Sequence, residues 1–240
     1  MEESQARVAA ENTLEVNELS VHFDATTVLK DLSFSVAKGS ALAIIGPNGA
    51  GKTVLLKALI GSLPHSGTMR WAVGVRIGYV PQKLDLERDI PITGLDFLKA
   101  RAAVAHKPTL EVPSVLSMVG IPLEVAQRPI GAMSGGQFQR LLIGFALVAG
   151  PNVLMLDEPT AGVDEPGQEQ LNELVRRLQK SQDLTVLFIS HELSVVYRYA
   201  DNVLCLSNQR AWFGRPSTIL TPESLRQIYG GEVSYHIHDH

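Results

Sequence analysis

A glycine-rich segment that ends in a lysine and a hydroxyl residue is the strongest chemical signal in this sequence. It follows an apolar run at 41–45 and opens a helical pattern at 54–60. The segment consists of Gly46, Pro47, Asn48, Gly49, Ala50, Gly51, Lys52 and Thr53. Glycines let successive N–H groups point inward, and the N-terminus of the following helix adds positive partial charge, so a polyphosphate can bind. We expect Lys52 to bridge the β- and γ-phosphates and the Thr53 hydroxyl to ligate Mg²⁺.

Two adjacent carboxylates, Asp157 and Glu158, follow a second apolar run at 153–156. They end a predicted strand, on the carboxyl edge where ligands of parallel sheets bind. Asp157 is placed to hold Mg²⁺, directly or through water, and Glu158 is a candidate general base for a water that attacks the γ-phosphate. Taken alone, the pair could also be a polar cap after a buried strand. The phosphate loop in the same chain favours the catalytic interpretation.

Composition narrows the class of protein. The 240 residues suggest one large domain or a domain with a subdomain, and 45% hydrophobic with 19% charged residues is typical of a globular chain. With 21 Lys and Arg against 25 Asp and Glu, the net charge of −4 gives no reason to expect a nucleic-acid partner. Cys205 cannot form an internal disulfide, and the acidic, polar start does not resemble a signal peptide. The longest apolar stretch, 141–150, is about half the length of a membrane-spanning helix, so we expect a cytoplasmic chain that does not cross the bilayer.

The hydrophobic pattern predicts an α/β fold. Alternating apolar residues at 14–23 and 28–36 indicate an N-terminal antiparallel β layer. Short continuous apolar runs, which suit the strands of a mostly parallel sheet, lie at 41–45, 153–156 and 185–189, and a hairpin is plausible at 202–213. Helical periodicity, as at 171–178, follows these runs, and such alternation is typical of a sheet covered by helices.

The stretch between the two halves of this core has a different character. It is mostly helical and is interrupted by prolines, so we expect a helical subdomain at about 83–150. The prediction is a single domain at 12–232, with its core at 12–82 and 151–232, followed by a tail at 233–240.

A third motif identifies a family. Residues 133–137, Met133-Ser134-Gly135-Gly136-Gln137, precede the carboxylate strand at the spacing found in ATP-binding cassette (ABC) ATPases, so the chain resembles this family. The resemblance extends to four further positions. Two lie before the third motif: Phe23, where the family has an aromatic residue that stacks on adenine, and Gln82, which follows the segment Tyr-Val-Pro. Two lie after it: Asp164, which follows the carboxylates, and His191, which follows the next strand.

The resemblance implies a P-loop ATPase core in which two copies stand head to tail and enclose two ATP molecules. Each site then combines residues of one copy with Ser134, Gly135 and Gly136 of the other; Gln137 belongs to the same motif. The first copy supplies Lys52, Thr53, Gln82, Asp157, Glu158 and His191, with Thr53, Gln82 and Asp157 at Mg²⁺.

Single motifs have simpler explanations. Phe23 could be buried on the apolar face of its strand, Ser-Gly-Gly-Gln could be an ordinary loop, and His191 could be a hydrogen-bonded residue at a strand end. The chain also departs from the family pattern. Met133 replaces leucine, and Ala-Gly-Val precedes Asp164 where Ser-Ala-Leu is commoner, which puts serine contacts across the dimer in doubt.

Within the family, the segments 76–84, 157–164 and 202–206 resemble ATPases of metal-ion importers, zinc and manganese types especially. This resemblance implies a transmembrane permease, an extracytoplasmic metal-binding protein and a peripheral location on the cytoplasmic face of the membrane. Alternatives are a soluble ABC ATPase of translation or DNA maintenance, an ABC subunit for a different substrate, and a regulatory cassette that hydrolyses ATP poorly. The intact Glu158 and His191 argue against the last of these.

Three histidines, His236, His238 and His240, crowd into the last five residues. Together with Asp239 they could bind Zn²⁺ and sense intracellular metal. Alternate residues of an extended tail point to opposite sides, so a bend or a second chain would be needed. A solvated terminus without a metal is the simpler interpretation.

Overall fold

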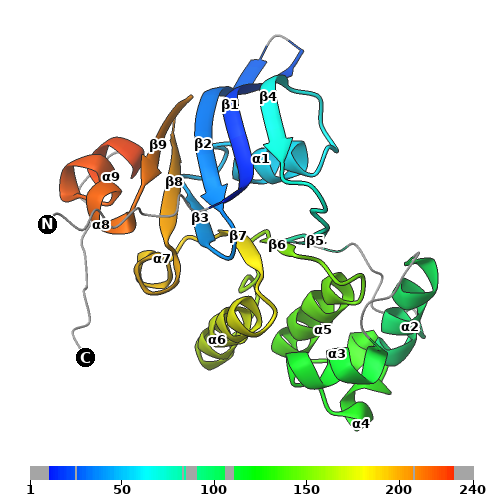
Figure 1. Ribbon diagram of the computed structural model, residues 1–240. Coiled ribbons are helices and arrows are strands. Elements are labelled where there is room, and N and C mark those ends of the chain that lie inside the picture. Colours follow the sequence, from blue (N-terminus) through cyan, green and yellow to red (C-terminus); the bar gives the residue numbers. More distant parts are fainter. Residues whose placement is uncertain are drawn as a thin grey trace, which may run out of the picture.

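The computed structural model describes residues 11–24, 26–82, 84, 91–105, 111–207 and 209–229. Two sheets and a group of helices make up the fold (Figure 1). The predicted α/β class is confirmed, with a mostly parallel sheet, an antiparallel β layer and a helical part between its halves.

The antiparallel layer contains three strands in the order β2-β1-β4. They are β1 (Asn12–Phe23), β2 (Thr26–Ala37) and β4 (Ser66–Trp71). Leu14 pairs with Val36, and Val16 pairs with Phe34, so their apolar side chains share one buried face. The sequence pattern predicted β1 and β2 but not β4, whose side chains are exposed or only partly buried.

The second sheet has six strands in the order β5-β6-β7-β3-β8-β9, and all but β9 run parallel. The strands are β3 (Ala41–Ile45), β5 (Ile77–Val80), β6 (Val153–Leu156), β7 (Thr185–Ile189), β8 (Asn202–Ser207) and β9 (Arg210–Gly214). Every residue of β3, β6 and β7 is buried, which explains the continuous apolar runs in the sequence. The hairpin predicted at 202–213 is the pair β8 and β9.

Helices cover both faces of this parallel sheet. Helix α1 (Lys52–Leu59) packs between the two sheets, where it shares one hydrophobic cluster with β1, β2 and one face of β3 (Figure 1). The opposite face of the sheet is covered by further helices that follow in the chain. These are α5 (Gly135–Leu147), α6 (Glu165–Ser181), α7 (Leu193–Tyr199), α8 (Pro216–Ile219) and α9 (Pro222–Tyr229).

The predicted helical stretch forms its own group of helices, away from the antiparallel layer (Figure 1). It contains α2 (Gly94–Val104), α3 (Val112–Val119), α4 (Leu123–Ala126), a 3₁₀ turn at Ile130–Ala132 and α5. Helix α5 contacts β5 and so joins this group to the sheet. It ends at Leu147, and Gly150 then takes a left-handed φ of 60°.

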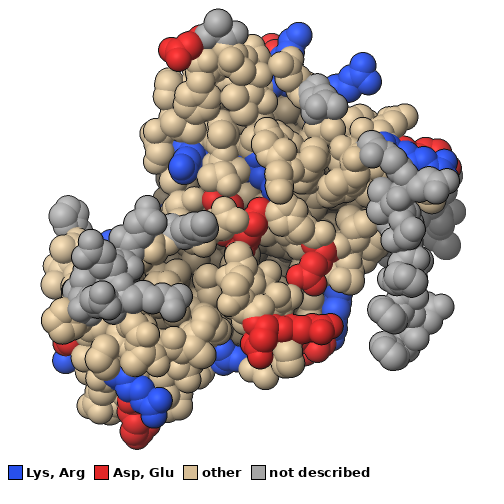
Figure 2. Space-filling view, turned by 180° about the vertical axis from the view of Figure 1, so that it is seen from behind, with Lys and Arg blue, Asp and Glu red and all other residues tan. Residues whose placement is uncertain are grey.

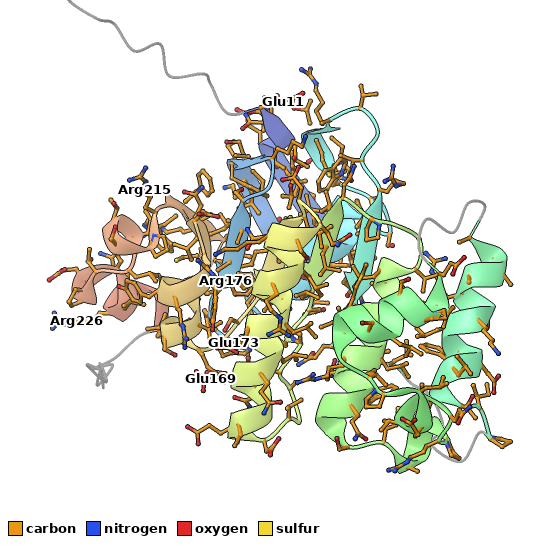
Figure 3. The ribbon with its side chains drawn as sticks, turned by 60° about the horizontal axis from the view of Figure 1, so that its bottom comes forward. Glu11, Glu169, Glu173, Arg176, Arg215 and Arg226 are labelled. Atoms are coloured by element: carbon orange, nitrogen blue, oxygen red, sulfur yellow. The ribbon has the colours of Figure 1, made fainter. Side chains whose placement is uncertain are left out.

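Helix α6 is tied to α7 by charged side chains. Glu169, Glu173 and Arg176 project from the side of α6 that faces α7 (Figure 3). Arg198 of α7 donates to Glu169 Oε1 at 3.1 Å, and Arg176 donates to the Arg198 carbonyl at 3.4 Å. Such exposed pairs contribute little to stability, and they mark the side of α6 on which α7 lies.

The surface carries both signs of charge. On the face shown in Figure 2, acidic side chains gather in the lower middle, and the described Lys and Arg are scattered. Within the described ranges, none of the helices has the length and apolar character needed to cross a membrane.

Candidate functional site

The phosphate loop connects β3 to α1, and two of its glycines cannot be replaced without distortion. Gly46 has a φ of 149°, and a Cβ there would lie 2.1 Å from the Leu206 carbonyl oxygen. Gly51, which precedes α1, has a φ of 94°, and its Cβ would lie 2.7 Å from the Leu29 side chain. The loop is therefore seated directly on β8 and β2.

Lys52 is the cation of this loop. It is only 6% exposed, and its Nζ donates to the carbonyl oxygens of Gly46 at 2.9 Å and of Pro47 at 3.1 Å. Burial lowers the pKa of Lys52, while the nearby negative charges of Glu158 and Asp157 raise it. These two carbonyls are neutral acceptors, so phosphate oxygens would be stronger partners for the ammonium group.

Asp157 follows β6 and is 1% exposed. Its Oδ1 accepts a hydrogen bond from Thr53 Oγ1 at 3.1 Å, and its Oδ2 accepts one from the Tyr79 hydroxyl at 3.2 Å. Burial raises the pKa of Asp157, and these two hydrogen bonds oppose that rise. Tyr79 also has a raised pKa because it is buried next to this carboxylate, so it remains a donor.

This pair of oxygen groups fits a divalent cation. None of the ion pairs among the described residues involves Asp157, and the hydrogen-bond donors to its side chain are neutral hydroxyls. A carboxylate and a hydroxyl beside a phosphate loop are the hard oxygen donors that Mg²⁺ prefers.

Glu158 lies at the carboxyl end of β6, which is the strand between β5 and β7. Gln82 follows β5 and donates from Nε2 to Glu158 Oε2 at 2.6 Å. His191 follows β7, and its Nε2 lies 2.5 Å from Glu158 Oε1, a contact that requires a proton on that nitrogen. Glu158 itself has a left-handed φ of 50°, which is unusual for a residue with a side chain. Because the carboxyl ends of parallel strands meet at one edge, residues far apart in sequence converge here.

These groups line one cleft of about 480 Å³. Its walls contain Val28, Asn48, Gly49, Gly51, Lys52, Thr53, Val54, Gln82, Glu158 and His191. The arrangement can bind a polyphosphate at the loop, hold a metal ion beside Thr53 and place a carboxylate near the terminal phosphate.

A second cleft, of about 620 Å³, lies at the start of α5. Ser134 caps this helix: its Oγ accepts from the Gln137 N–H at 3.2 Å, and its own N–H donates to Gln137 Oε1 at 3.1 Å. Gly135 packs against the loop that leads to α6, since a Cβ would lie 2.7 Å from the Gly162 oxygen. Gly136 and Asp164 complete the predicted residues on its walls.

The predicted site residues thus fall into two groups, and the two clefts have no lining residue in common. Phe23, at the end of β1, is 44% exposed, so the alternative that it is buried on the strand face is wrong. It does not line the Lys52 cleft, and it has free surface for stacking. His236, His238 and His240 lie outside the described residues.

Three residues of the first site were not singled out from the sequence. Val28 and Val54 line the Lys52 cleft, and Tyr79 donates to Asp157. The signal for Tyr79 is its position: it lies on the strand next to the carboxylate strand, three residues before Gln82. A polar hydroxyl on a buried strand there is a reason to look for a partner.

Comparisons with known proteins agree with this geometry. The ABC transporter family model matches residues 29–161. The zinc import ATP-binding protein ZnuC of Cereibacter sphaeroides is 39% identical over 213 residues, or 88% of this chain and 86% of that protein. ZnuC of Yersinia pestis is 37% identical over 232 residues, or 94% and 90%.

Two solved structures are also similar. An inward-facing conformation of a putative metal-chelate type ABC transporter has a TM-score of 0.82 at 28% identity, with 91% of this chain and 89% of that chain covered. The cbiO1 protein of Clostridium perfringens, part of the cbiONQ transporter complex, has a TM-score of 0.74 at 28% identity, with 90% and 94% covered. The phosphate loop, the converging carboxylates and these matches show that the chain belongs to the ABC transporter family.

Proposed function

We propose that this chain is the ATP-hydrolysing, nucleotide-binding subunit of a transporter that imports zinc. The observation that carries the ATPase assignment is the position of Glu158, held between Gln82 and His191 in the cleft of Lys52. The relatives named zinc import ATP-binding proteins support the substrate, because they match this chain over most of its length. We further propose one ABC ATPase domain at 12–232, with its helical subdomain at about 83–150.

ATP binds with its phosphates on the loop between β3 and α1. Lys52 exchanges its carbonyl partners for β- and γ-phosphate oxygens, and the loop N–H groups donate to the same phosphates. Thr53 and Asp157, with the help of Gln82, would hold Mg²⁺, which would supply positive charge to stabilise the phosphate oxygens as the γ-phosphate passes to water and ADP leaves. Phe23 offers its exposed ring to adenine.

Glu158 accepts a proton from the attacking water. In the structure both of its oxygens are occupied, one by Gln82 and one by His191. Each carboxylate oxygen has two lone pairs, so each can still accept a hydrogen bond from the attacking water. Opening of the His191 contact would free this side chain to donate to the γ-phosphate.

A second copy of the chain completes each site. The cleft with Lys52 lacks the serine and glycine N–H groups that begin α5, and these lie in the other cleft. In a head-to-tail dimer, the N-terminus of α5 from one copy can close on the γ-phosphate held by the other. ATP then acts as the contact between the two copies.

Closing of this dimer drives a transmembrane permease, which we place as the partner of the helical subdomain. The ATPase sits on the cytoplasmic face of the membrane, and an extracytoplasmic metal-binding protein delivers the ion. This arrangement is supported by the names of the similar proteins, which concern zinc import and a transporter complex.

Uptake of radiolabelled zinc tests this function. Cells that lack the chain receive either the wild-type chain or Glu158→Gln, together with the permease that it is proposed to drive. We expect zinc uptake with the wild type only, and parallel assays with manganese test the other predicted ion. If the cells take up manganese but not zinc, the assignment of zinc as the substrate is wrong. Co-purification with ribosomes or DNA and no integral membrane protein would overturn the transporter role.

A further inference from the structure

The hydroxyl of Tyr79 contacts the buried carboxylate of the metal site. It donates to Asp157 Oδ2 at 3.2 Å, while Thr53 donates to Oδ1 at 3.1 Å. We propose that Tyr79 is a positioning residue for the Mg²⁺ that accompanies ATP: its hydroxyl fixes the Asp157 carboxylate in the orientation seen in the structure. This inference rests on the proposed Mg·ATP site and deepens it.

Strand pairing explains why the phenol reaches this carboxylate. Tyr79 lies in register with Met155 on the parallel pair β5 and β6. Side chains two residues apart on a strand share a face, so Met155 and Asp157 point the same way, and Tyr79 projects beside them. The neighbouring Gly78 contacts the opposite side, since a Cβ there would lie 3.1 Å from the Ala146 oxygen of α5. Strand β5 is therefore held in place on one face while Tyr79 extends on the other.

The burial of Asp157 makes this hydrogen bond important. With 1% exposure, its carboxylate has little access to water that could replace a lost donor. Among the described residues, the Asp157 side chain accepts hydrogen bonds from the hydroxyls of Thr53 and Tyr79. Thr53 is itself assigned to the metal, so Tyr79 is the partner that orients Asp157 without being a ligand. Loss of such an outer partner typically reduces metal affinity by about 10- to 100-fold.

The substitution Tyr79→Phe removes the hydroxyl and keeps the ring. The chain offers two matched controls that carry the same change elsewhere. Tyr199 has a buried hydroxyl with no hydrogen-bond partner among the described residues, and Tyr197 donates to the Leu220 carbonyl at 2.8 Å. Tyr199→Phe tests the removal of a buried oxygen, and Tyr197→Phe tests the loss of a hydrogen bond away from the site.

Two binding measurements separate the metal from the nucleotide. The first is the affinity of each purified chain for ATP in EDTA, by calorimetry. The second is the affinity of the chain and a non-hydrolysable ATP analogue for Mn²⁺, used as a paramagnetic substitute for Mg²⁺, by electron paramagnetic resonance. For Tyr79→Phe we expect about tenfold weaker Mn²⁺ binding and a metal-free ATP affinity within about twofold of wild type. Both controls should match wild type.

A double-mutant cycle with Asp157→Asn shows whether Tyr79 acts through Asp157. We expect Tyr79→Phe to have little further effect on Mn²⁺ affinity once Asp157 is replaced. Losses that add would overturn the proposal, as would wild-type Mn²⁺ affinity in Tyr79→Phe, an equal loss in a control, or an equal loss of metal-free ATP affinity. A folding equilibrium would weaken metal-free ATP binding as well as Mn²⁺ binding, so the titration in EDTA detects it.

The same data distinguish this proposal from the proposed function. If the wild-type chain gains no nucleotide affinity when metal is added, the Mg·ATP site itself is wrong. If wild type gains affinity and Tyr79→Phe gains as much, only the role of Tyr79 is wrong.

Discussion

Glu158 combines an unusual backbone conformation with two short side-chain contacts. Its φ of 50° turns the chain sharply after the buried strand, and this turn brings the carboxylate between Gln82 and His191. This backbone conformation costs free energy, which indicates that the position of the Glu158 carboxylate matters more than local stability.

The substitution Glu158→Gln tests the base. An amide cannot accept the proton of the attacking water, so we expect phosphate release to fall by about 10²- to 10⁴-fold. ATP affinity should change little, because Lys52 and the loop N–H groups still bind the phosphates. Phosphate release and equilibrium binding are measured on the same sample, and turnover at the wild-type rate would show that Glu158 is not the base.

Asp157 carries a buried charge with neutral hydrogen-bond donors, which costs stability when no metal is bound. For Asp157→Asn we therefore expect the nucleotide-free chain to unfold about 2–4 °C higher, equivalent to about 1 kcal/mol, while hydrolysis falls. Thermal unfolding followed by circular dichroism provides the measurement.

Asp183→Asn is the matched control, since its side chain is 76% exposed and it pairs with Lys38 only at 3.8 Å. It should leave the midpoint unchanged. If the unfolding midpoint of Asp157→Asn is equal to or below that of the control, the buried charge of Asp157 does not cost stability.

Two adjacent glycines begin α5, and we expect alanine substitutions at these two positions to change the free energy of unfolding in opposite directions. A Cβ on Gly135 would lie 2.7 Å from a backbone oxygen, and a Cβ on Gly136 would lie 3.6 Å from the Val163 side chain. Gly135→Ala must displace the loop before α6 and should lower the free energy of unfolding by about 1–3 kcal/mol. Gly136→Ala sits inside a helix with ordinary contacts and should raise it by up to about 1 kcal/mol.

Urea unfolding of both variants measures this difference. Equal effects would contradict the close packing of α5 against Gly162. The comparison concerns stability only, because both glycines belong to the proposed binding motif.

Elements with a strong hydrophobic pattern could be predicted from the sequence. The buried strands β3, β6 and β7 have continuous apolar runs, and β1 and β2 alternate except at irregularities such as the shift of register between Val16 and Leu19. Strand β4 has mostly exposed side chains, and β5 has only four residues with a glycine among them, so neither has such a pattern. Helices α8 and α9 are short, and the sequence pattern did not indicate them.

Some residues of the site could likewise be predicted from the sequence, and others could not. Its loop, carboxylates and histidine belong to motifs, whereas the Tyr79 contact depends on the register between β5 and β6. Register is a tertiary property, and the single sequence does not specify which strands are neighbours. The exposure of Phe23 likewise depends on the end of β1 and not on its alternation.

For the whole molecule, the two clefts predict assembly that depends on ATP. We expect Glu158→Gln to be a monomer without nucleotide and a dimer with ATP, because ATP bridges the copies but is not consumed. Size exclusion with light scattering gives the masses. Ser134→Arg in the same background places a long charged side chain in the second cleft and should prevent the dimer while one ATP still binds to each chain. A dimer of unchanged stability would contradict the head-to-tail arrangement.

The separation of the clefts also determines how defects are inherited. If two copies stand head to tail, a chain with Lys52→Ala and a chain with Ser134→Ala, which leaves room for the dimer, are each impaired alone, since every site in either dimer has one defect. When the two are mixed, about half of the dimers pair one of each, and in these one site carries both defects while the other carries none. We expect the mixture to recover part of the ATPase activity that neither parent has, measured after co-expression with two different affinity tags. Two recessive alleles in this one chain would then complement each other, as alleles of two different genes do.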